Sequence, residues 1–176
     1  MTNILMKNAA VIVPVYREEN NELKIVLIRR SNHGVHSGQL AFPGGKYESS
    51  DASFMHTALR ETEEEIGLPK DNITVLDELP VIETMATGFR IYPFLAKISP
   101  CRSWTIQESE VAEVLEVSVS DLVKPEYHAE ELMQFDNWPY PQRIPYLKVG
   151  PHKLWGASYR ILHPILPRLL NNEFEI

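Results

Sequence analysis

Apolar positions along the chain gather into short runs separated by turn-forming residues. Runs of this length, rich in β-branched and aromatic side chains, predict β-strands. We expect strands at residues 9–16, 23–28, 73–79, 89–98, 144–149 and 153–155, and a further strand that includes Val117 and Val119. A polar turn at 17–22 joins the first two strands. Pro93 interrupts the fourth run and predicts an edge position or a bulge there, because proline cannot donate to a strand ladder.

Two segments instead have helical spacing. At about 100° per residue, the apolar side chains of residues 52–68 fall within one arc of roughly 140°. They are Phe54, Met55, Ala58, Leu59, Thr62 and Ile66. Gly67 predicts the end of this central helix, since a left-handed residue commonly closes a helix. A closing helix is expected at 158–170, interrupted by Pro164 and Pro167. Its buried side would carry Tyr159, Leu162, Ile165 and Leu169.

The order of these elements predicts the fold class. Strands on both sides of one central helix, with another helix at the end of the chain, indicate an α/β protein with a mixed sheet packed between helices. The length of 176 residues is typical of one domain, so residues 1–176 are expected to form a single unit. Residues 125–151 are dense in proline and aromatic residues and suggest an extended excursion from the core.

The central helix carries a row of acidic residues beside its apolar face. Glu61, Glu64 and Glu65 fall on one arc of roughly 100°. Glu63 points away from them. Like charges three and four residues apart destabilise a helix by roughly 0.2–0.5 kcal/mol per pair, and Arg60 offsets this only in part by pairing with Glu64. A divalent cation would turn the repulsion into coordination, since hard ions such as Mg²⁺ bind carboxylate oxygens. A solvated acidic face remains the alternative.

Composition and charge narrow the classes of function. The chain is 44% hydrophobic and 23% charged, as is typical of a soluble globular protein. Its net charge of −7 argues against nonspecific binding to nucleic acid or to an anionic membrane. No segment approaches the roughly 20 apolar residues of a membrane span. Cys101 is the only cysteine, which excludes an internal disulfide and favours a reducing, cytoplasmic setting.

A segment rich in hydrogen-bond donors precedes the central helix. It runs from Arg29 and Arg30 through His33 and His36 to the turn Phe42-Pro43-Gly44-Gly45. Arginine suits phosphate because its planar fork donates two hydrogen bonds. We therefore predict that these two arginines and two histidines bind an anionic substrate, with an ordinary surface loop as the alternative.

Together, the glycine turn and the helix resemble the Nudix box, G-x5-E-x7-R-E-U-x-E-E-x-G-U, which is the signature of Nudix hydrolases. The matching residues are Arg60, Glu61, Glu64, Glu65, Gly67 and Leu68, and Thr62 stands at a position that is usually aliphatic. This chain carries one extra residue inside the box, so Gly45 and Asp51 take the roles of the pattern's first glycine and first glutamate. A match of this length and spacing is far more specific than a lone glycine motif.

The residues ahead of the box are similar to one Nudix subfamily, the coenzyme A pyrophosphatases. That subfamily carries L-L-T-x-R-S-x3-R-x3-G-x3-F-P-G-G, which residues 26–31 and 38–45 resemble closely. The interval from Ser31 to Gly38 is one residue short and lacks the internal arginine of the pattern; His33, Val35 and His36 occupy that region.

The resemblance implies an α/β/α sandwich that hydrolyses a pyrophosphate bond with Mg²⁺ or Mn²⁺. Its substrate would be a nucleoside diphosphate linked to another group, preferably coenzyme A, with 3′,5′-ADP and 4′-phosphopantetheine as products. The implied metal ligands are Glu61, Glu64, Glu65 and the carbonyl of Gly44. Arg60 would orient a glutamate. The general base stays open among Glu61, Glu64 and Glu113, the last of which lies in an acidic stretch of the kind that supplies a further carboxylate near the metals.

Two other functions remain open. One is Nudix hydrolysis of a different substrate, such as ADP-ribose, a dinucleotide or an oxidised nucleoside triphosphate. The other is a catalytically inactive module that binds a nucleotide or a protein, although such a binder has no need to retain a destabilising carboxylate cluster. The sequence leaves the oligomeric state open, a homodimer included.

Overall fold

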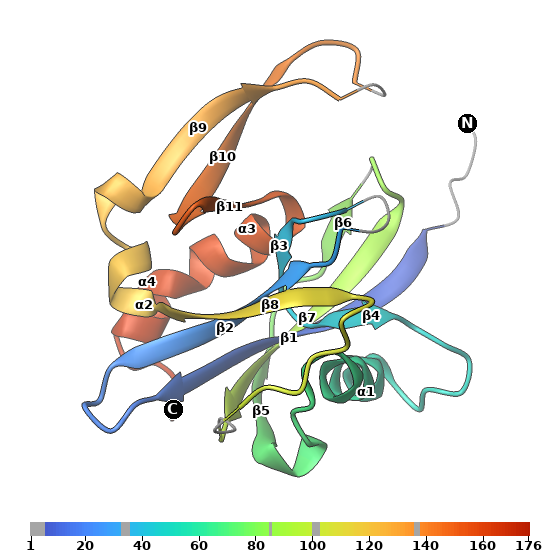
Figure 1. The fold of residues 1–176 in the computed structure, drawn as a ribbon, viewed down its shortest axis with the longest axis vertical. Helices are drawn as coiled ribbons and strands as arrows, with labels where there is room; N and C mark the ends of the chain where they lie inside the picture. The colour runs from blue at the N-terminus through green and yellow to red at the C-terminus, as the bar shows by residue number, and fades with distance from the viewer. Residues whose placement is uncertain (1–5, 33–35, 85, 100–102, 136–137) are drawn as a thin grey trace.

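The structure, a computed structural model, describes residues 6–32, 36–84, 86–99, 103–135 and 138–176. Its centre is a mixed eight-stranded sheet, with one helix against one face and the C-terminal helices against the other (Figure 1). A second, three-stranded sheet lies beside the C-terminal helices. The predicted α/β sandwich with a mixed central sheet is therefore confirmed.

The elements have the following bounds. The central sheet contains β1 (Lys7–Arg17), β2 (Leu23–Arg30), β3 (Leu40–Ala41), β4 (Gly44–Lys46), β5 (Ile73–Glu78), β6 (Ile82–Thr84), β7 (Phe89–Ile98) and β8 (Val111–Ser118). The second sheet contains β9 (His128–Met133), β10 (Gln142–Val149) and β11 (His152–Trp155). The helices are α1 (Phe54–Ile66), α2 (Val119–Leu122), α3 (Gly156–Leu162) and α4 (Leu166–Leu170), with 3₁₀ turns at Lys70–Asn72, Pro125–Tyr127 and His163–Ile165. In the described part of the chain, no helix combines the length and apolar character of a membrane span.

β1 and β7 form the middle of the central sheet and run parallel. β2 pairs antiparallel with β1, as the polar turn between them predicts. β8 runs antiparallel along β2, and the short β4 pairs with the first half of β1. Successive side chains of a strand face opposite sides, so β1 supplies residues to both cores. Ala10 and Ile12 pack toward α1, whereas Val13 and Val15 pack toward the C-terminal helices.

α1 is capped at both ends, and its C-terminal end lies where Gly67 predicts. The Ser53 side chain accepts a hydrogen bond from a backbone N–H of the first turn at 3.1 Å. Gly67 adopts the left-handed conformation expected at the end of the helix, with φ 68°. Ile66, in the last turn, is fully buried, whereas Met55, in the first turn, is 41% exposed. The predicted core position of Met55 is therefore wrong, because burial is concentrated in the later turns of the helix.

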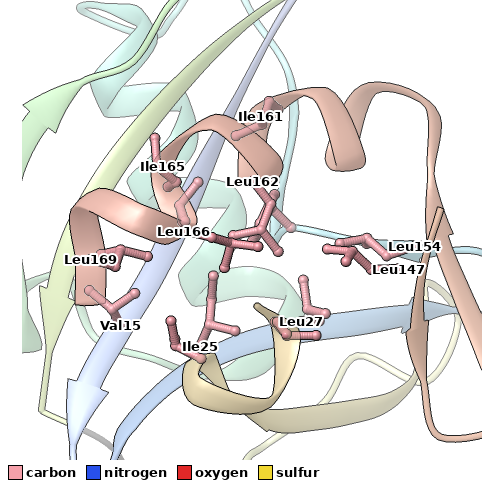
Figure 2. Packing of buried hydrophobic residues seen from close by; sticks show 14 of the residues in the cluster. Val15, Ile25, Leu27, Leu147, Leu154, Ile161, Leu162, Ile165, Leu166 and Leu169 are labelled. Atoms are coloured by element: carbon pink, nitrogen blue, oxygen red, sulfur yellow. The ribbon is translucent and has the colours of Figure 1, made fainter. Parts of the chain in front are cut away.

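The largest core lies between the central sheet, the second sheet and the C-terminal helices (Figure 2). Its labelled members are Val15, Ile25, Leu27, Leu147, Leu154, Ile161, Leu162, Ile165, Leu166 and Leu169. Pro164 and Pro167 divide the closing helix as expected: α3 ends at Leu162 and α4 begins at Leu166. Tyr159, expected on the buried side, is only half-buried.

Pro93 does not mark an edge strand, because β7 lies between β1 on one side and β5 and β6 on the other. The Pro93 carbonyl accepts a hydrogen bond from the Leu79 N–H at 2.9 Å, at the point where the neighbour of β7 changes from β5 to β6. The strand ladder is already interrupted there, and the register with β5 shifts nearby. An interior proline is therefore tolerated without the loss of a regular ladder bond.

Two further expectations about strands are corrected. Val119 begins α2 and does not continue the strand that carries Val117. Residues 125–151 were expected to form an extended excursion; their described part instead includes two strands, β9 and β10, which pair antiparallel within the second sheet. β9 was not predicted from the sequence, because its short segment HAEELM has few large apolar side chains and mixes exposed with half-buried positions.

Candidate active site

Two glycines allow the glutamates of α1 to approach β4. The Glu65 side chain accepts a hydrogen bond at Oε2 from the Gly44 backbone N–H at 2.9 Å. A Cβ on Gly45 would lie 2.3 Å from the carboxyl carbon of Glu61, and a Cβ on Gly44 would lie 2.2 Å from the backbone oxygen of Ala10. Glu65 was expected on a face next to the buried one, yet it is only 2% exposed. The correction follows from β4, whose glycine backbone packs directly against the two carboxylates.

A third carboxylate joins this pair from outside α1. Oxygens of Glu61, Glu65 and Glu110, hereafter the glutamate triad, lie within 4.8 Å of one another. Glu110 precedes β8, and its segment is held against α1 because the Gln107 N–H donates to the Glu65 carbonyl at 3.0 Å. The Glu110 carbonyl in turn accepts a hydrogen bond from the Ser31 N–H at 2.8 Å. Three separate elements, α1, β2 and the start of β8, therefore meet at the triad.

Burial and repulsion between carboxylates raise the pKa values of two members of the glutamate triad, Glu65 and Glu61. Burial raises the pKa of Glu65 from an ordinary 4.5 to about 8, and the other two carboxylates add to the rise. The Gly44 N–H and the charge of Arg30 oppose it. Burial also raises the pKa of Glu61, against the opposing charge of Arg60. Three carboxylates this close fit a divalent cation that prefers oxygen ligands, such as Mg²⁺ or Mn²⁺.

Arg60 joins the residues of the box into one hydrogen-bonded network. Its Nε and Nη2 donate to the two carboxylate oxygens of Asp51 at 2.9 and 3.0 Å. Its Nη1 donates to Glu61 at 3.1 Å and to Glu64 at 3.2 Å. Asp51 is buried and also accepts from the Thr57 hydroxyl at 2.8 Å. The guanidinium holds the pKa of Asp51 well below its usual range. Arg60 is thus directed at carboxylates and positions Glu61.

Two glutamates expected at the site lie outside the triad. The Glu64 side chain is 51% exposed and is bound to Arg60. Glu113 lies on β8, where it accepts a hydrogen bond from Arg29 Nε at 3.1 Å and has His152 Nε2 at 3.9 Å. In the acidic stretch around it, the residue that reaches the glutamates of α1 is Glu110. Charge alone could not select between the two, because the choice depends on where β8 begins.

Of the donor residues expected at the substrate, the structure describes Arg29, Arg30 and His36, and the two arginines have different partners. Arg29 and Arg30 are consecutive at the end of β2, where the register with β8 shifts. Arg29 pairs with a glutamate of β8, whereas Arg30 lies close enough to the triad for its charge to lower the pKa of the buried glutamate. His36 is half-buried in the turn before β3. His33 lies outside the described residues, as does Cys101.

Comparison with known families and proteins matches this chain to the NUDIX domain over residues 6–138. The chain is 32% identical over 154 residues to an uncharacterized Nudix hydrolase, NudL, from Citrobacter koseri, in an alignment that covers 87% of this chain and 72% of that protein. It is also 32% identical over 161 residues to NudL from Salmonella newport, covering 90% of this chain and 81% of that protein.

Solved structures share the fold at lower sequence identity. A MutT/nudix family protein from Enterococcus faecalis has a TM-score of 0.64 at 20% identity, covering 94% of this chain and 62% of that one. An Ap4A hydrolase from C. elegans has a TM-score of 0.54 at 19% identity, covering 65% and 82%. The NUDIX domain of Shewanella oneidensis NrtR, solved with ADP ribose, has a TM-score of 0.52 at 18% identity, covering 67% and 76%. With a family match over most of its length and the box residues joined in one network, this chain belongs to the Nudix hydrolase family.

Proposed function

We propose that this chain hydrolyses the pyrophosphate bond of a nucleoside diphosphate linked to another group, and that coenzyme A or a derivative is its preferred substrate. The products from coenzyme A would be 3′,5′-ADP and 4′-phosphopantetheine. The observation that carries the hydrolytic part is the glutamate triad packed against the Gly44-Gly45 turn. Such a group suits a cation-bound pyrophosphate, whose negative charges otherwise repel a nucleophile.

The residues proposed to hold Mg²⁺ or Mn²⁺ are Glu61, Glu65 and Glu110, with the backbone carbonyl of Gly44 as a further oxygen ligand. The cation, when bound, neutralises phosphate charge and lowers the pKa of a bound water. Arg60 keeps Glu61 oriented, because Asp51 holds the guanidinium from its other edge. The proton of the attacking water passes to Glu61 or Glu64. Glu113, which is engaged by Arg29 as Glu61 and Glu64 are by Arg60, is the third candidate for that role.

The substrate preference rests on the similarity of residues 26–31 and 38–45 to coenzyme A pyrophosphatases and on the positions of two arginines. Coenzyme A carries a 3′-phosphate on its ribose, at a distance from the pyrophosphate. Arg30 acts on the triad electrostatically and is therefore assigned to the pyrophosphate. Arg29, which is turned toward β8, is assigned with His33 and His36 to the 3′-phosphate. A charge-assisted hydrogen bond to phosphate contributes about 1.5–3 kcal/mol, or roughly ten- to a hundredfold in relative affinity.

A different Nudix substrate is the second candidate. The interval between Ser31 and Gly38 lacks the arginine of the coenzyme A pattern, and an Ap4A hydrolase and an ADP ribose complex are among the proteins with this fold. An inactive nucleotide-binding module is disfavoured by the triad, because a binder does not need to bury a carboxylate at such cost.

We further propose that the activity resides in a single domain, residues 1–176, and that the protein acts in the cytoplasm. Monomer and homodimer are both open.

A substrate panel with product identification tests the proposal. Coenzyme A, dephospho-coenzyme A, ADP-ribose, a diadenosine polyphosphate and an oxidised nucleoside triphosphate would each be incubated with Mg²⁺, with Mn²⁺ and without metal. We expect coenzyme A to be cleaved fastest, and dephospho-coenzyme A about tenfold more slowly. Faster cleavage of ADP-ribose, or equal cleavage of the two coenzyme A forms, would remove the coenzyme A assignment. If no compound is cleaved with either metal, the hydrolytic proposal itself fails.

Two neighbouring substitutions separate the assigned phosphate contacts. Arg29→Ala should slow cleavage of coenzyme A but not of dephospho-coenzyme A, because only the former carries the 3′-phosphate. Arg30→Ala should slow both compounds by a similar factor. The ratio of kcat/KM for the two compounds is the measurement, since it cancels any general loss of folded enzyme.

A further inference from the structure

Residues 104–110, hereafter the strap, cross the C-terminal end of α1. The Thr105 N–H donates to the Ile66 carbonyl at 3.2 Å, and the Gln107 N–H donates to the Glu65 carbonyl at 3.0 Å. These carbonyls belong to the last turn of the helix, which has no partner of its own for them. The strap passes so close that a Cβ on Gly67 would lie 2.7 Å from the Cβ of Thr105. The strap therefore completes the end of the helix that carries the triad.

The far end of the strap delivers Glu110. The backbone N–H groups of Glu110 and Val111 both donate to the Gln107 carbonyl at 2.9 Å, which forms a tight turn. Ser31, at the end of β2, donates its N–H to the Glu110 carbonyl at 2.8 Å and its hydroxyl to the Ser109 carbonyl at 2.7 Å. The main chain of Glu110 is thus held on two sides. Its carboxylate reaches the triad only while the strap stays in this path.

The near end of the strap is held by a different set of hydrogen bonds. Trp104 donates its Nε1–H to Glu116 Oε1 at 2.6 Å. The hydroxyl of Tyr16, on β1, donates to the other oxygen, Glu116 Oε2, at 2.5 Å. Glu116 lies on β8, so one carboxylate links the strap to two strands of the central sheet. We call Tyr16, Trp104 and Glu116 the clasp.

The strap depends on these hydrogen bonds more than on core packing. Trp104 and Ile106 are half-buried against the core below α1, but Thr105 and residues 107–110 are exposed. Few buried apolar contacts therefore resist a sideways movement of the strap. Loss of the clasp would leave the near end held only by the Thr105 hydrogen bond to Ile66 and by the partial packing of Trp104 and Ile106, while the sheet and α1 keep their own packing.

We propose that the clasp is a positioning device for the cation site: Tyr16 and Trp104, through Glu116, hold the strap so that Glu110 completes the glutamate triad. This inference rests on the proposed function, because it takes the triad to be a cation site. Among the described residues, no hydrogen bond or ion pair joins a clasp residue to the triad, so we take the clasp to act through the strap. The clasp should set the affinity for the cation, and the chemistry at saturating cation should be little changed.

A double-mutant cycle tests the clasp, with Mn²⁺ as the probe and no substrate present. The proteins compared are the wild type, Trp104→Phe, Glu110→Gln and the double variant. Phenylalanine keeps an aromatic ring against the core but cannot donate to Glu116. Binding would be followed by titration calorimetry, and folding by the thermal midpoint without metal. Trp155→Phe is the matched control, since it makes the same change in the second sheet.

We expect Trp104→Phe to weaken Mn²⁺ binding by about threefold to tenfold, as coupled residues in one network do. Glu110→Gln should weaken binding by more, and the double variant no further than Glu110→Gln alone, because the clasp acts only through Glu110. Tyr16→Phe should resemble Trp104→Phe, and Trp155→Phe should bind Mn²⁺ like the wild type. Trp104→Phe should need a higher Mn²⁺ concentration for half-maximal turnover. At saturating Mn²⁺ its kcat should equal that of the wild type.

The outcomes separate this inference from the proposed function. If Trp104→Phe lowers the thermal midpoint but keeps wild-type Mn²⁺ affinity, the clasp is merely structural and the inference is overturned. Additive losses in the double variant would overturn it too, because they would mean that Trp104 does not act through Glu110. If Glu110→Gln itself binds Mn²⁺ like the wild type, the triad is not the cation site, and the proposed function is then what fails.

Discussion

At the scale of single residues, Glu65 shows the conflict between stability and function most clearly. It is buried beside two other carboxylates, and its pKa is raised to about 8. In the unfolded chain the same carboxyl ionises near its ordinary value of 4.5. Between these two pH values the folded state binds more protons than the unfolded state, so folding stability falls as pH rises. A bound divalent cation would offset this loss by binding the ionised form.

Glu65→Gln should therefore abolish most activity and yet stabilise the metal-free protein at alkaline pH. The amide oxygen can still accept the Gly44 N–H, while the buried charge is gone. We expect the variant to gain about 2–4 kcal/mol of unfolding free energy near pH 9, and to lose that gain at about pH 4, where both states hold the proton. Chemical denaturation at the two pH values, with a chelator present, measures the difference. A variant that is less stable than wild type at the higher pH would contradict the assigned burial cost.

Glu63→Gln is the control, because Glu63 lies on the same helix but points away from the triad and is exposed. It should keep near-normal turnover and show no comparable change in stability with pH. A loss of activity as large as that of Glu65→Gln would mean that general charge on α1, and not the triad, supports catalysis.

Alanine at the two glycines of β4 should have different effects: loss of metal affinity at Gly45 and loss of folding at Gly44. The three atoms nearest to a Cβ on Gly45 all belong to the flexible end of Glu61, the closest at 2.3 Å, so Gly45→Ala should fold while the Glu61 carboxylate is displaced. We expect Mn²⁺ affinity to fall by about ten- to a hundredfold, as when a group supporting a ligand is lost. Gly44→Ala would place a Cβ 2.2 Å from the backbone of Ala10, at φ +150°, and should lose folded protein instead. Comparison of thermal midpoints with metal affinities separates the two; equal unfolding of both variants would contradict the prediction.

At the scale of elements, α1 depends on contacts at its two ends. Ser53 caps the N-terminus, and Gly67 with the strap closes the C-terminus. The first turn of α1 has no acidic residue and the last turn has no basic residue. The helix therefore lacks the charged side chains that usually stabilise a helix dipole. The helix therefore carries its unfavourable carboxylates because caps, Arg60 and the sheet hold it in place.

Gly67→Ala should destabilise the protein by more than backbone strain alone accounts for. Gly67 and Gly150 both have positive φ, at +68° and +56°, so alanine at either position costs roughly 1–2 kcal/mol. Only at Gly67 does the new Cβ meet a neighbour, Thr105 of the strap, at 2.7 Å. Denaturant unfolding of Gly67→Ala and Gly150→Ala gives the difference between them. Equal losses would show that the strap yields freely, and that its contact with α1 is weak.

At the scale of the whole molecule, the central sheet separates two kinds of packing. One face holds α1, and the other holds the large core shared with the second sheet and the C-terminal helices (Figures 1 and 2). Leu147 and Leu154 of the second sheet are fully buried in that shared core. Their burial makes the second sheet a part of the same packed unit as the strands that support the site.

Leu154→Ala should accordingly destabilise the whole chain. Truncation of a fully buried leucine costs about 2–5 kcal/mol, which includes the cavity left behind. Leu132→Ala removes the same atoms from β9, on the other side of β10 in the same sheet, but Leu132 is 67% exposed, so we expect a change within about 0.5 kcal/mol. Unfolding followed by both tryptophan fluorescence and far-UV circular dichroism measures this. If the two probes diverged in Leu154→Ala, the second sheet would unfold on its own and the single-domain proposal would fail.

Local signals in the sequence were sufficient for most of the elements. The apolar runs correspond to β1, β2, β5, β7, β10 and β11, and Gly67 ended α1 where a glycine cap predicts. These features depend on neighbours in the chain, and short-range periodicity and turn chemistry report such neighbours directly. The very short strands β3, β4 and β6 escaped detection, because two or three residues are too few to show a period.

The sequence by itself determined the α/β class, the box helix with its row of glutamates, and the family resemblance. Only the tertiary structure decided which carboxylates meet: Glu110 joins Glu61 and Glu65, while Glu64 stays exposed and Glu113 pairs with Arg29. The physical reason is that helical spacing sets directions around one axis only. Which side chain is covered, and which distant loop arrives beside it, depends on how β4 and the strap pack against that helix.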